Sequence, residues 1–250
     1  MLQGRPRNAP RAEDPVAAER ARLDAIAAAH DYSHGLNAAS MRYSAQIFAR
    51  HWRGPRCLEL GPAEGVASVM LAEHFADLTL VDGAERFCVD LRQRLPQASV
   101  VCAAFEEFAP QRPFDTIVLG RVLEHVAEPA AILRRARGWL APDGVLCAAV
   151  PNANSLHRQA AVLMGLLPSV EALNDADRSH GHRRVYDWPG FRADFAAAGL
   201  TIRVAGGYWL KPLANAQIEA SWTPQMVAAF MRLGEDFPDV AGEIYVVATA

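Results

Sequence analysis

The central part of this 250-residue chain alternates short apolar segments with helix-like segments, and this alternation limits the possible folds more than any other feature. The apolar segments include residues 56–60, 78–82 and 115–119, which are apolar over most of their length and not at every second position. Strands of this kind are buried on both faces, as in a parallel sheet with helices on each side. The pattern predicts an α/β fold with a doubly wound, mostly parallel sheet.

Seven strands are expected, at residues 56–60, 78–82, 100–102, 115–119, 144–150, 201–205 and 244–249. The last two are separated by a helical insert and would pair like a hairpin, so one strand runs antiparallel to the others. The spacing also predicts a helix after an N-cap at Asp14, a second capped by Asn37, and a third over residues 160–167. Two more are expected to begin after Asp187 and Thr223, the first of them ending at Gly199.

Composition excludes several classes of partner. The chain holds 25 Lys and Arg against 28 Asp and Glu, a net charge of −3, so it lacks the basic excess of proteins that bind nucleic acids or membrane surfaces. It has no apolar run long enough to span a bilayer, and its N-terminus lacks the apolar stretch of a secretory signal. The four cysteines form no C-x-x-C pair and are expected to be reduced core residues of a cytoplasmic protein.

The loop after the first expected strand carries the chemistry. It begins at Glu59, reaches Gly61 where the backbone can turn tightly, and continues through Glu64 to Gly65, where a helix can pack closely. Asp82, 23 residues after Glu59, ends the next strand, in the position of an acid that accepts hydrogen bonds from ribose hydroxyls. The loop lacks the G-x-G-x-x-G of dinucleotide sites, and its acids would repel a pyrophosphate. A negative loop suits the ammonium and sulfonium of S-adenosylmethionine.

Five segments in this order, CLELGPAEG, LTLVDGAE, VVCAAFEEF, FDTIVLGRVLEHV and LAPDGVLCAAVPN, resemble the class I S-adenosylmethionine-dependent methyltransferases. LEH and the later HGHRRVYDWPGF are similar to the small-molecule O- and N-methyltransferases related to ubiquinone-pathway enzymes. The likeness is close over residues 55–150 and loose elsewhere. It implies a Rossmann-like sheet of seven strands with the last one antiparallel, and conversion of S-adenosylmethionine to S-adenosylhomocysteine.

The resemblance also implies the residues that bind the cofactor. Glu59 and Gly61 would lie beside its methionine part, and Gly65 would pack the following helix. Asp82 would hold the ribose hydroxyls, with Gly83 against the adenosine. The remaining implied positions are Ala104 where the family usually has an acid, Phe105 against the adenine, Glu106 in place of that acid, and Gly120 and Arg121 beside the methyl group. The chain departs from the family pattern at Ala104 and at Ala63, which replaces the usual middle glycine.

Two histidines are candidate general bases, because a neutral imidazole can take a proton from an acceptor near neutral pH. His125 follows the fourth strand, and His182 lies in a long polar insert. Since a long insert suits a larger acceptor, we favour His182. The candidate substrate residues are Tyr32, His34, His180, Arg183 and Tyr186, and Arg42 and Tyr43 are candidates for binding the cofactor carboxylate. No metal site is expected.

These observations predict a methyltransferase for a small polar metabolite, such as a sugar, a nucleotide-sugar or a natural-product intermediate. The polar, Arg- and His-bearing loop and the segment Tyr208-Trp209-Leu210-Lys211 favour a partly anionic or glycosidic acceptor. The alternatives are a quinone or phenol O-methyltransferase, a noncatalytic S-adenosylmethionine-binding protein with a degenerate site, and a nicotinamide-dependent oxidoreductase. The expected organisation is a flexible tail at 1–12, a helical lid at 13–53 and a methyltransferase domain at 54–250, with inserts at 152–187 and 208–242 covering the acceptor site. The protein is expected to be a monomer or homodimer.

Overall fold

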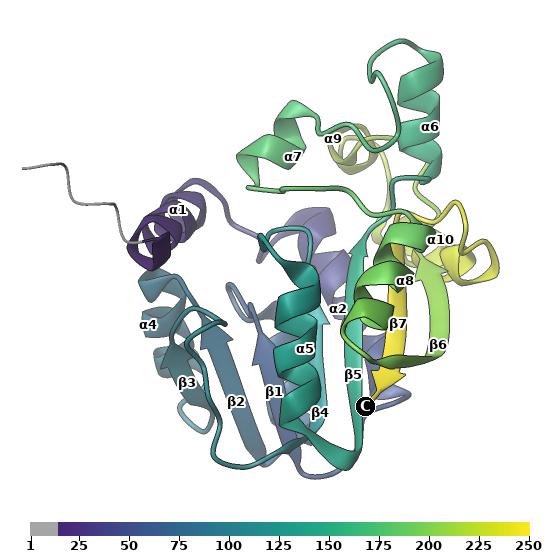
Figure 1. The fold of residues 1–250 in the computed structure, drawn as a ribbon. Helices are drawn as coiled ribbons and strands as arrows, with labels where there is room; N and C mark the ends of the chain where they lie inside the picture. The colour runs from purple at the N-terminus through teal and green to yellow at the C-terminus, as the bar shows by residue number, and fades with distance from the viewer. Residues whose placement is uncertain (1–14) are drawn as a thin grey trace, which may run out of the picture.

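The computed structural model of the protein describes residues 15–250, with side chains from residue 18 onward (Figure 1). Its strands are β1 (Arg56–Leu60), β2 (Asp77–Asp82), β3 (Ser99–Cys102), β4 (Phe114–Gly120), β5 (Leu140–Pro151), β6 (Thr201–Tyr208) and β7 (Glu243–Thr249). Its helices are α1 (Pro15–Ala29), α2 (Gly35–Ala49), α3 (Val66–His74), α4 (Glu85–Arg94), α5 (Pro129–Trp139), α6 (Leu156–Leu163), α7 (Asp175–Ser179), α8 (Trp188–Ala197), α9 (Asn215–Glu219) and α10 (Pro224–Asp236). The predicted tail at 1–12 and the predicted cap at Asp14 lie outside the described residues.

All seven strands form one sheet in the order β3-β2-β1-β4-β5-β7-β6. The pairs among β1 to β5 are parallel, whereas β7 is antiparallel to both β5 and β6. This arrangement confirms the predicted fold class. The inner strands are buried along nearly their whole length, whereas the edge strand β6 alternates between exposed and half-buried residues over its first six positions. Burial on both faces therefore explains the continuous apolar segments of the sequence.

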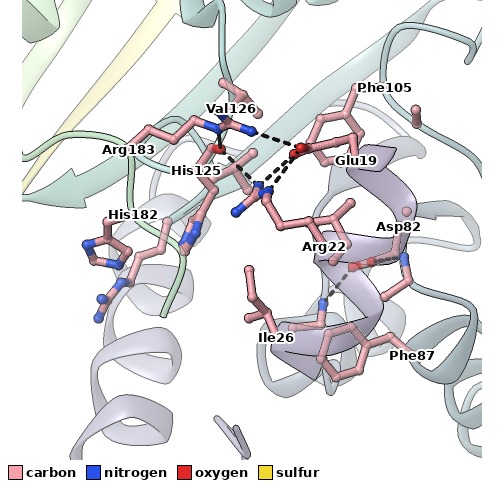
Figure 2. A pocket seen from close by; sticks show the side chains of 18 of the residues that line it. Glu19, Arg22, Ile26, Asp82, Phe87, Phe105, His125, Val126, His182 and Arg183 are labelled. Carbon is pink, nitrogen blue, oxygen red and sulfur yellow. Dashed lines mark hydrogen bonds and ion pairs between the residues drawn. The ribbon is translucent and has the colours of Figure 1, made fainter. Parts of the chain in front are cut away.

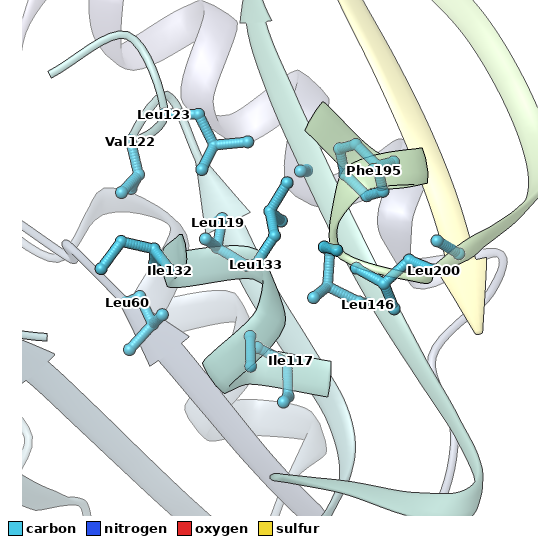
Figure 3. Close-up of a cluster of buried hydrophobic side chains, with 14 of the residues drawn as sticks. Leu60, Ile117, Leu119, Val122, Leu123, Ile132, Leu133, Leu146, Phe195 and Leu200 are labelled. Carbon is cyan, nitrogen blue, oxygen red and sulfur yellow. The ribbon is translucent and has the colours of Figure 1, made fainter. Parts of the chain in front are cut away.

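Helices cover both faces of the sheet. On one face, Leu133 of α5 and Phe195 of α8 pack against Ile117 and Leu146 of the central strands (Figure 3). On the other face, α2, α3, α4 and α10 contribute buried side chains to a second cluster: Phe48, Leu71, Leu91 and Met231. Each such side chain contributes roughly 1.5–3 kcal/mol when fully buried, so these two layers hold the sheet rigid beneath the loops at its carboxyl edge.

The order of the strands determines where a ligand can bind. From β1 the chain winds outward through β2 and β3, and then returns to the other side of β1 to form β4 and β5. The loops after β1 and β4 therefore diverge at the carboxyl edge and leave a crevice between them. Within residues 15–250 no helix is both long and apolar enough to cross a membrane.

Two of the helix caps follow the prediction. The Asp187 carboxylate accepts a hydrogen bond from the Gly190 N–H at the start of α8, and the Thr223 hydroxyl accepts one from Met226 at the start of α10. Gly199 has a φ of +72° just beyond α8, as expected for a glycine that ends a helix.

Three predicted boundaries are wrong, for identifiable reasons. Asn37 does not cap α2; the helix begins at Gly35, and the carboxylate of Glu219 in α9 accepts the hydrogen bond of the Leu36 N–H at 2.9 Å. The helix predicted at 160–167 spans Leu156–Leu163, since Gly165 leaves the helical conformation at φ +72°. The fifth strand begins at Leu140, four residues before the predicted start, because its first part already pairs with Phe114 of β4.

Candidate active site

A cavity of about 490 Å³ opens at the carboxyl edge of the sheet, above the ends of β1, β2 and β4 (Figure 2). Its floor is formed by the loops after these strands, and its cover by α1 and part of the insert between β5 and α8. The volume is in the range of sites for small molecules and cofactors.

The loop after β1 brings its backbone to the cavity. Gly61 has a φ of +67°, and its N–H donates to the Val81 carbonyl at 2.9 Å, which binds the loop to the end of β2. A Cβ at this position would lie 2.8 Å from Val122 Cγ2. Ala63 also has a positive φ, of 48°, so the residue that replaces the usual glycine adopts a conformation that glycine would favour. Gly65, also at positive φ, is the N-cap residue before α3 and does not line the cavity.

Asp82 ends β2 with its carboxylate buried at the cavity wall. One oxygen accepts a hydrogen bond from the Ala84 N–H at 2.9 Å, and the other accepts one from the Ala63 N–H at 3.2 Å. Burial raises the pKa of Asp82 to about 6 even though these N–H groups oppose the shift. Each carboxylate oxygen has a second lone pair, so both can still accept a hydrogen bond from a ligand.

Two further carboxylates lie near Asp82 without cationic partners. Glu59 does not line the main cavity but faces a small void behind it, where it accepts a hydrogen bond from Ser68 Oγ at 2.5 Å. Burial raises the pKa of Glu59 to about 7. Glu64 accepts a hydrogen bond from the Tyr32 N–H, and burial raises its pKa too. Among the described side chains, no Lys, Arg or His forms an ion pair with any of these three acids.

The loop after β3 forms the adjoining wall. Ala104 is buried, Phe105 is half-buried and Glu106 is exposed at the rim, and all three line the cavity. Phe105 Cζ lies 3.6 Å from the position that a Gly61 Cβ would occupy, so its ring faces the first loop. The neighbouring Glu107 pairs with Arg20 of α1 at 2.6 Å.

Arg121 begins the loop after β4 in a left-handed conformation, φ +61°, that non-glycine residues rarely adopt. Its guanidinium lies between two buried carboxylates, 3.3 Å from Glu243 and 3.7 Å from Glu124. Burial raises the pKa of both acids, although Arg121 opposes the shift. Both oxygens of Glu124 are buried without a hydrogen bond to the described residues. The positive charge of Arg121 is therefore already compensated by carboxylates of the protein itself.

The structure brings both candidate bases to the cavity. The rings of His125 and His182 pack edge to face with their centroids 4.7 Å apart (Figure 2). Burial, together with nearby cations, holds the pKa of His125 well below its usual range, so this imidazole is neutral at pH 7. Glu124, His125 and His182 each present one possible metal-ligand atom, all within 4.8 Å of one another. The guanidinium of Arg121 also lies 3.7 Å from Glu124 and supplies a counter-charge to it.

Helix α1 covers the cavity and is bound to its far wall. Glu19 accepts hydrogen bonds from Arg22 at 2.6 Å and from Arg183 of the insert at 2.8 Å. Both guanidinium groups also donate to the His125 carbonyl, Arg183 at 2.9 Å and Arg22 at 3.3 Å (Figure 2). Leu23 and Ile26 of the same helix line the cavity below them. These α1 residues were not among the predicted site residues, because only the folded chain shows which face of the helix meets the cavity.

Several predicted site residues lie elsewhere. Tyr186 is buried in the core and its hydroxyl donates to Asp194 at 2.7 Å. His34 is exposed and pairs with Asp31, and His180 stacks on His30 with ring centroids 4.2 Å apart. Tyr32 does line the cavity, as do Gly83, Gly120 and Arg183, whereas Arg42 and Tyr43 do not. The predicted cover at 208–242 contributes no lining residue, and Asn37 and Met41 of α2, which were not predicted, do.

A seven-stranded sheet in the order β3-β2-β1-β4-β5-β7-β6, with β7 antiparallel and a cavity at its switch point, is the Rossmann-like fold of the class I methyltransferases. The sequence matches the family described as "Methyltransferase domain" over residues 29–204. The chain belongs to this family.

Curated relatives and a solved structure agree with this membership. Trans-aconitate 2-methyltransferase from Methylobacterium radiotolerans is 29% identical over 140 residues, 54% of this chain and 54% of that protein. Ubiquinone biosynthesis O-methyltransferase from Idiomarina loihiensis is 30% identical over 138 residues, 52% of this chain and 55% of that protein. The chain spans about half the length of these curated relatives. An S-adenosylmethionine-dependent methyltransferase from Mesorhizobium loti has the same fold, with a TM-score of 0.61 and 17% identity over 86% of this chain and 100% of that one.

Proposed function

We propose that this protein is an S-adenosylmethionine-dependent methyltransferase that transfers a methyl group to an oxygen or nitrogen of a small polar metabolite. The observation that carries this proposal is the group of three acids, Glu59, Glu64 and Asp82, which are at least partly buried beside the cavity and have neutral partners only. Unpaired carboxylates at such a site favour a cationic ligand, because burial leaves their charge without compensation. A nicotinamide dinucleotide fits poorly beside these three acids, because its pyrophosphate is anionic.

The residues present fit this cofactor. Asp82 has free lone pairs at the cavity wall for two ribose hydroxyls, and Gly61 lacks the side chain that would narrow the cavity. Phe105 and Ala104 would cover the adenine, with Glu106 at the rim. Gly120 and Arg121, at the end of β4, would border the methyl group. Glu59 stands behind this wall and would act through its charge, since it does not line the main cavity.

When bound, S-adenosylmethionine supplies a strongly electrophilic methyl group, so the protein has to orient the acceptor, exclude water and accept a proton. Helix α1 supports the exclusion of water, because its residues Leu23 and Ile26 line the cavity. His182 is the residue that would accept the proton. The burial and neighbouring cations that depress the pKa of His125 make that residue a poor base, so we assign the proton to His182, which also lines the cavity.

The charged side chains around the end of β4, where the methyl acceptor would lie, favour an uncharged acceptor. Arg22 and Arg183 both bind Glu19, and Arg121 lies between Glu124 and Glu243. A carboxylate such as that of trans-aconitate would have to displace one of these acids. An alcohol, a phenol or an amine would not.

A phenol or quinol is a second candidate acceptor, because apolar side chains dominate the walls between the arginines. Leu23, Ile26, Met41, Val122 and Val126 all line the cavity. They would bury the body of an aromatic ring, and a hydroxyl on that ring would face the histidines.

Two measurements test the proposal. Calorimetric titration and thermal unfolding should show that S-adenosylhomocysteine binds and stabilises the protein, whereas NAD does neither, because a ligand stabilises the state to which it binds. S-adenosylhomocysteine release should then be compared with trans-aconitate and with catechol, a diphenol that has no carboxylate, as acceptors. We expect turnover with the phenol only. Stabilisation by NAD alone would overturn the proposed function, and turnover with trans-aconitate alone would overturn the uncharged acceptor.

A further inference from the structure

We infer that Asp177 is a positioning residue for His182: it holds the ring in the tautomer that has its proton on Nδ1, so that Nε2 is free to take a proton from the acceptor. This inference rests on the proposed function. Asp177 lies in α7, in the insert between β5 and α8, and does not line the cavity. It would therefore act only through the histidine.

The Asp177 carboxylate is fixed through one of its two oxygens. Oδ2 accepts hydrogen bonds from the Asn174 N–H at 3.0 Å and from Arg158 Nη1 at 3.0 Å. Arg158 is itself buried and donates to the carbonyls of Val170 and Ala172. These bonds fasten the carboxylate to the surrounding loop and leave Oδ1 free of them.

Oδ1 of Asp177 faces His182. It lies 3.5 Å from His182 Nδ1, and the exposed fractions of the two side chains are only 13% and 5%. His182 Nδ1 is buried and makes no hydrogen bond to the described residues, so its contact with Oδ1 is an ion-pair distance of 3.5 Å. The Asp177 carbonyl also accepts a hydrogen bond from the His182 N–H at 2.9 Å, so the two residues are fixed relative to each other. Catalytic hydrogen bonds are often long in ligand-free sites and tighten when the substrate is bound, and we expect this of the pair.

The charge state of Asp177 suits this role. Although burial alone would raise it, the pKa of Asp177 is held well below its ordinary value by His182, the Asn174 N–H and Arg158. The carboxylate therefore stays ionised across the working pH range and can accept a hydrogen bond from Nδ1–H.

Other charged groups surround His182 without replacing Asp177. They lie just after α7, on the loop after β4 and on β7: His180, Arg121, Glu124, His125 and Glu243. Asp177 is the carboxylate that lies 3.5 Å from Nδ1. Nδ1 and Nε2 flank Cε1 and point in different directions, so with Nδ1 at Asp177 we assign Nε2 to the cavity that His182 lines.

The chemical step balances with this assignment. His182 Nε2 takes the hydroxyl proton while the acceptor oxygen bonds to the methyl carbon and the carbon–sulfur bond breaks, leaving the electron pair on sulfur. The imidazole becomes an imidazolium, with its Nδ1–H pointing at Asp177. A ring in the other tautomer would present an N–H to the acceptor and could not take the proton.

The tautomer can be measured without knowing the acceptor. We would record long-range ¹H–¹⁵N spectra of the histidine rings in the full chain with S-adenosylhomocysteine bound, and assign His182 from a His182→Gln variant. The proton should reside on Nδ1 in the wild-type protein. In Asp177→Asn the ratio of the two tautomers should move toward Nε2–H by about tenfold or more, since a charge-assisted hydrogen bond is lost. Asp175→Asn, an exposed acid of the same helix, should leave the ratio unchanged.

With an acceptor that supports turnover, Asp177→Asn should lower kcat by about 10²–10⁴-fold with little change in KM. Turnover and tautomer ratio should both be insensitive to EDTA. A wild-type His182 protonated on Nε2 would overturn the inference even if Asp177→Asn failed to fold, and so would an unchanged ratio in a folded Asp177→Asn. Failure of the wild-type protein to bind S-adenosylhomocysteine would instead overturn the proposed function, whereas the tautomer measured for His182 would remain valid.

Discussion

At the β1–β2 end of the cavity, acids lie without cations, whereas at the β4 end each cation lies against an acid. Glu59 and Asp82 are bonded to a hydroxyl and to backbone N–H groups. Arg121 and Arg183 are bonded to Glu243 and Glu19. At the first end the buried carboxylates lack a counter-charge, which is unfavourable. A cationic ligand would supply that counter-charge, so this end can contribute to the affinity for the ligand. The second is already neutral, so it would select its ligand by shape and hydrogen bonding.

The two ends are also assembled over different distances along the chain. The Ala63 N–H and the Asp82 carboxylate are 19 residues apart, within a single β-α-β unit. At the other end, Arg183 reaches Glu19 across 164 residues, and Arg22 reaches the His125 carbonyl across 103. The cofactor end is therefore part of a rigid sheet, while the acceptor end depends on how α1 and the insert dock. Each of the following predictions tests this contrast.

The largest effect is expected for Gly61→Val. A branched side chain would meet Val122 and occupy the space that the cofactor needs, so affinity for S-adenosylhomocysteine should fall by at least about 100-fold, as measured by calorimetry. Gly165→Val is a matched control, because Gly165 also has a positive φ, of +72°, but has open space around its Cβ position. Both variants should be destabilised, but only Gly61→Val should lose binding. Equal affinities in the two variants would show that the loop is only a turn.

Asp82→Ala should have the next largest effect. Loss of the carboxylate would leave two ribose hydroxyls without their acceptor, at a cost of roughly 1.5–3 kcal/mol in binding free energy. Asp77→Ala, at the other end of the same strand, removes an acid that pairs with Arg56 and Arg112. It should leave the dissociation constant unchanged. An Asp82→Ala protein that binds S-adenosylhomocysteine as tightly as the wild type would rule out the ribose contact.

This contrast explains how much of the site could be predicted from the sequence. Gly61, Asp82 and Phe105 lie directly after strands of a parallel sheet, so an apolar segment followed by a loop is enough to locate them. The antiparallel last strand follows from the helical insert before it. Gly61 and Asp82 depend on neighbours within one β-α-β unit, and the structure has these residues where they were predicted.

The rest depends on contacts between distant segments. Nothing near Leu36 in the sequence indicates that Glu219 caps its helix, and nothing near Arg121 indicates that Glu243 supplies its counter-charge. Tyr186 was predicted as a substrate residue because it lies in a polar segment, but its ring turns into the core and bonds to Asp194. A polar segment alone does not specify which of its side chains face the cavity.

The third prediction concerns pH, and it tests whether the cofactor end is electrostatically stressed. Burial raises the pKa of Glu59 to about 7, so between roughly pH 4.5 and 7 the folded protein binds a proton that the unfolded chain does not. The free energy of unfolding should therefore fall as the pH rises through this window, by about 1.4 kcal/mol per pH unit from Glu59. Asp82, with a pKa raised to about 6, adds to the same trend at lower pH.

Urea unfolding at pH 5 and pH 6 can isolate this contribution. Glu59→Gln keeps the size of the side chain and removes its titration, so the variant should lose about 1.4 kcal/mol less stability than the wild type between these two pH values. Glu73→Gln, an exposed acid of α3, should behave like the wild type. Equal losses in Glu59→Gln and the wild type would mean that Glu59 carries no such stress.

The smallest effect is expected at the cover. Glu19 bridges α1 to the insert through Arg183, and both side chains are about one-third exposed, so the pair should contribute roughly 0.2–1 kcal/mol. If α1 must move for the ligand to leave, Glu19→Gln should raise the dissociation rate of S-adenosylhomocysteine by about 1.5- to 5-fold in stopped-flow measurements. The association rate should change less, and Glu73→Gln again serves as the control. Because the bridge is partly exposed, raising the salt concentration should speed release from the wild type more than from Glu19→Gln. A wild-type rate that is independent of salt and equal to that of Glu19→Gln would mean that the cover does not control release, and that the acceptor end is as rigid as the cofactor end.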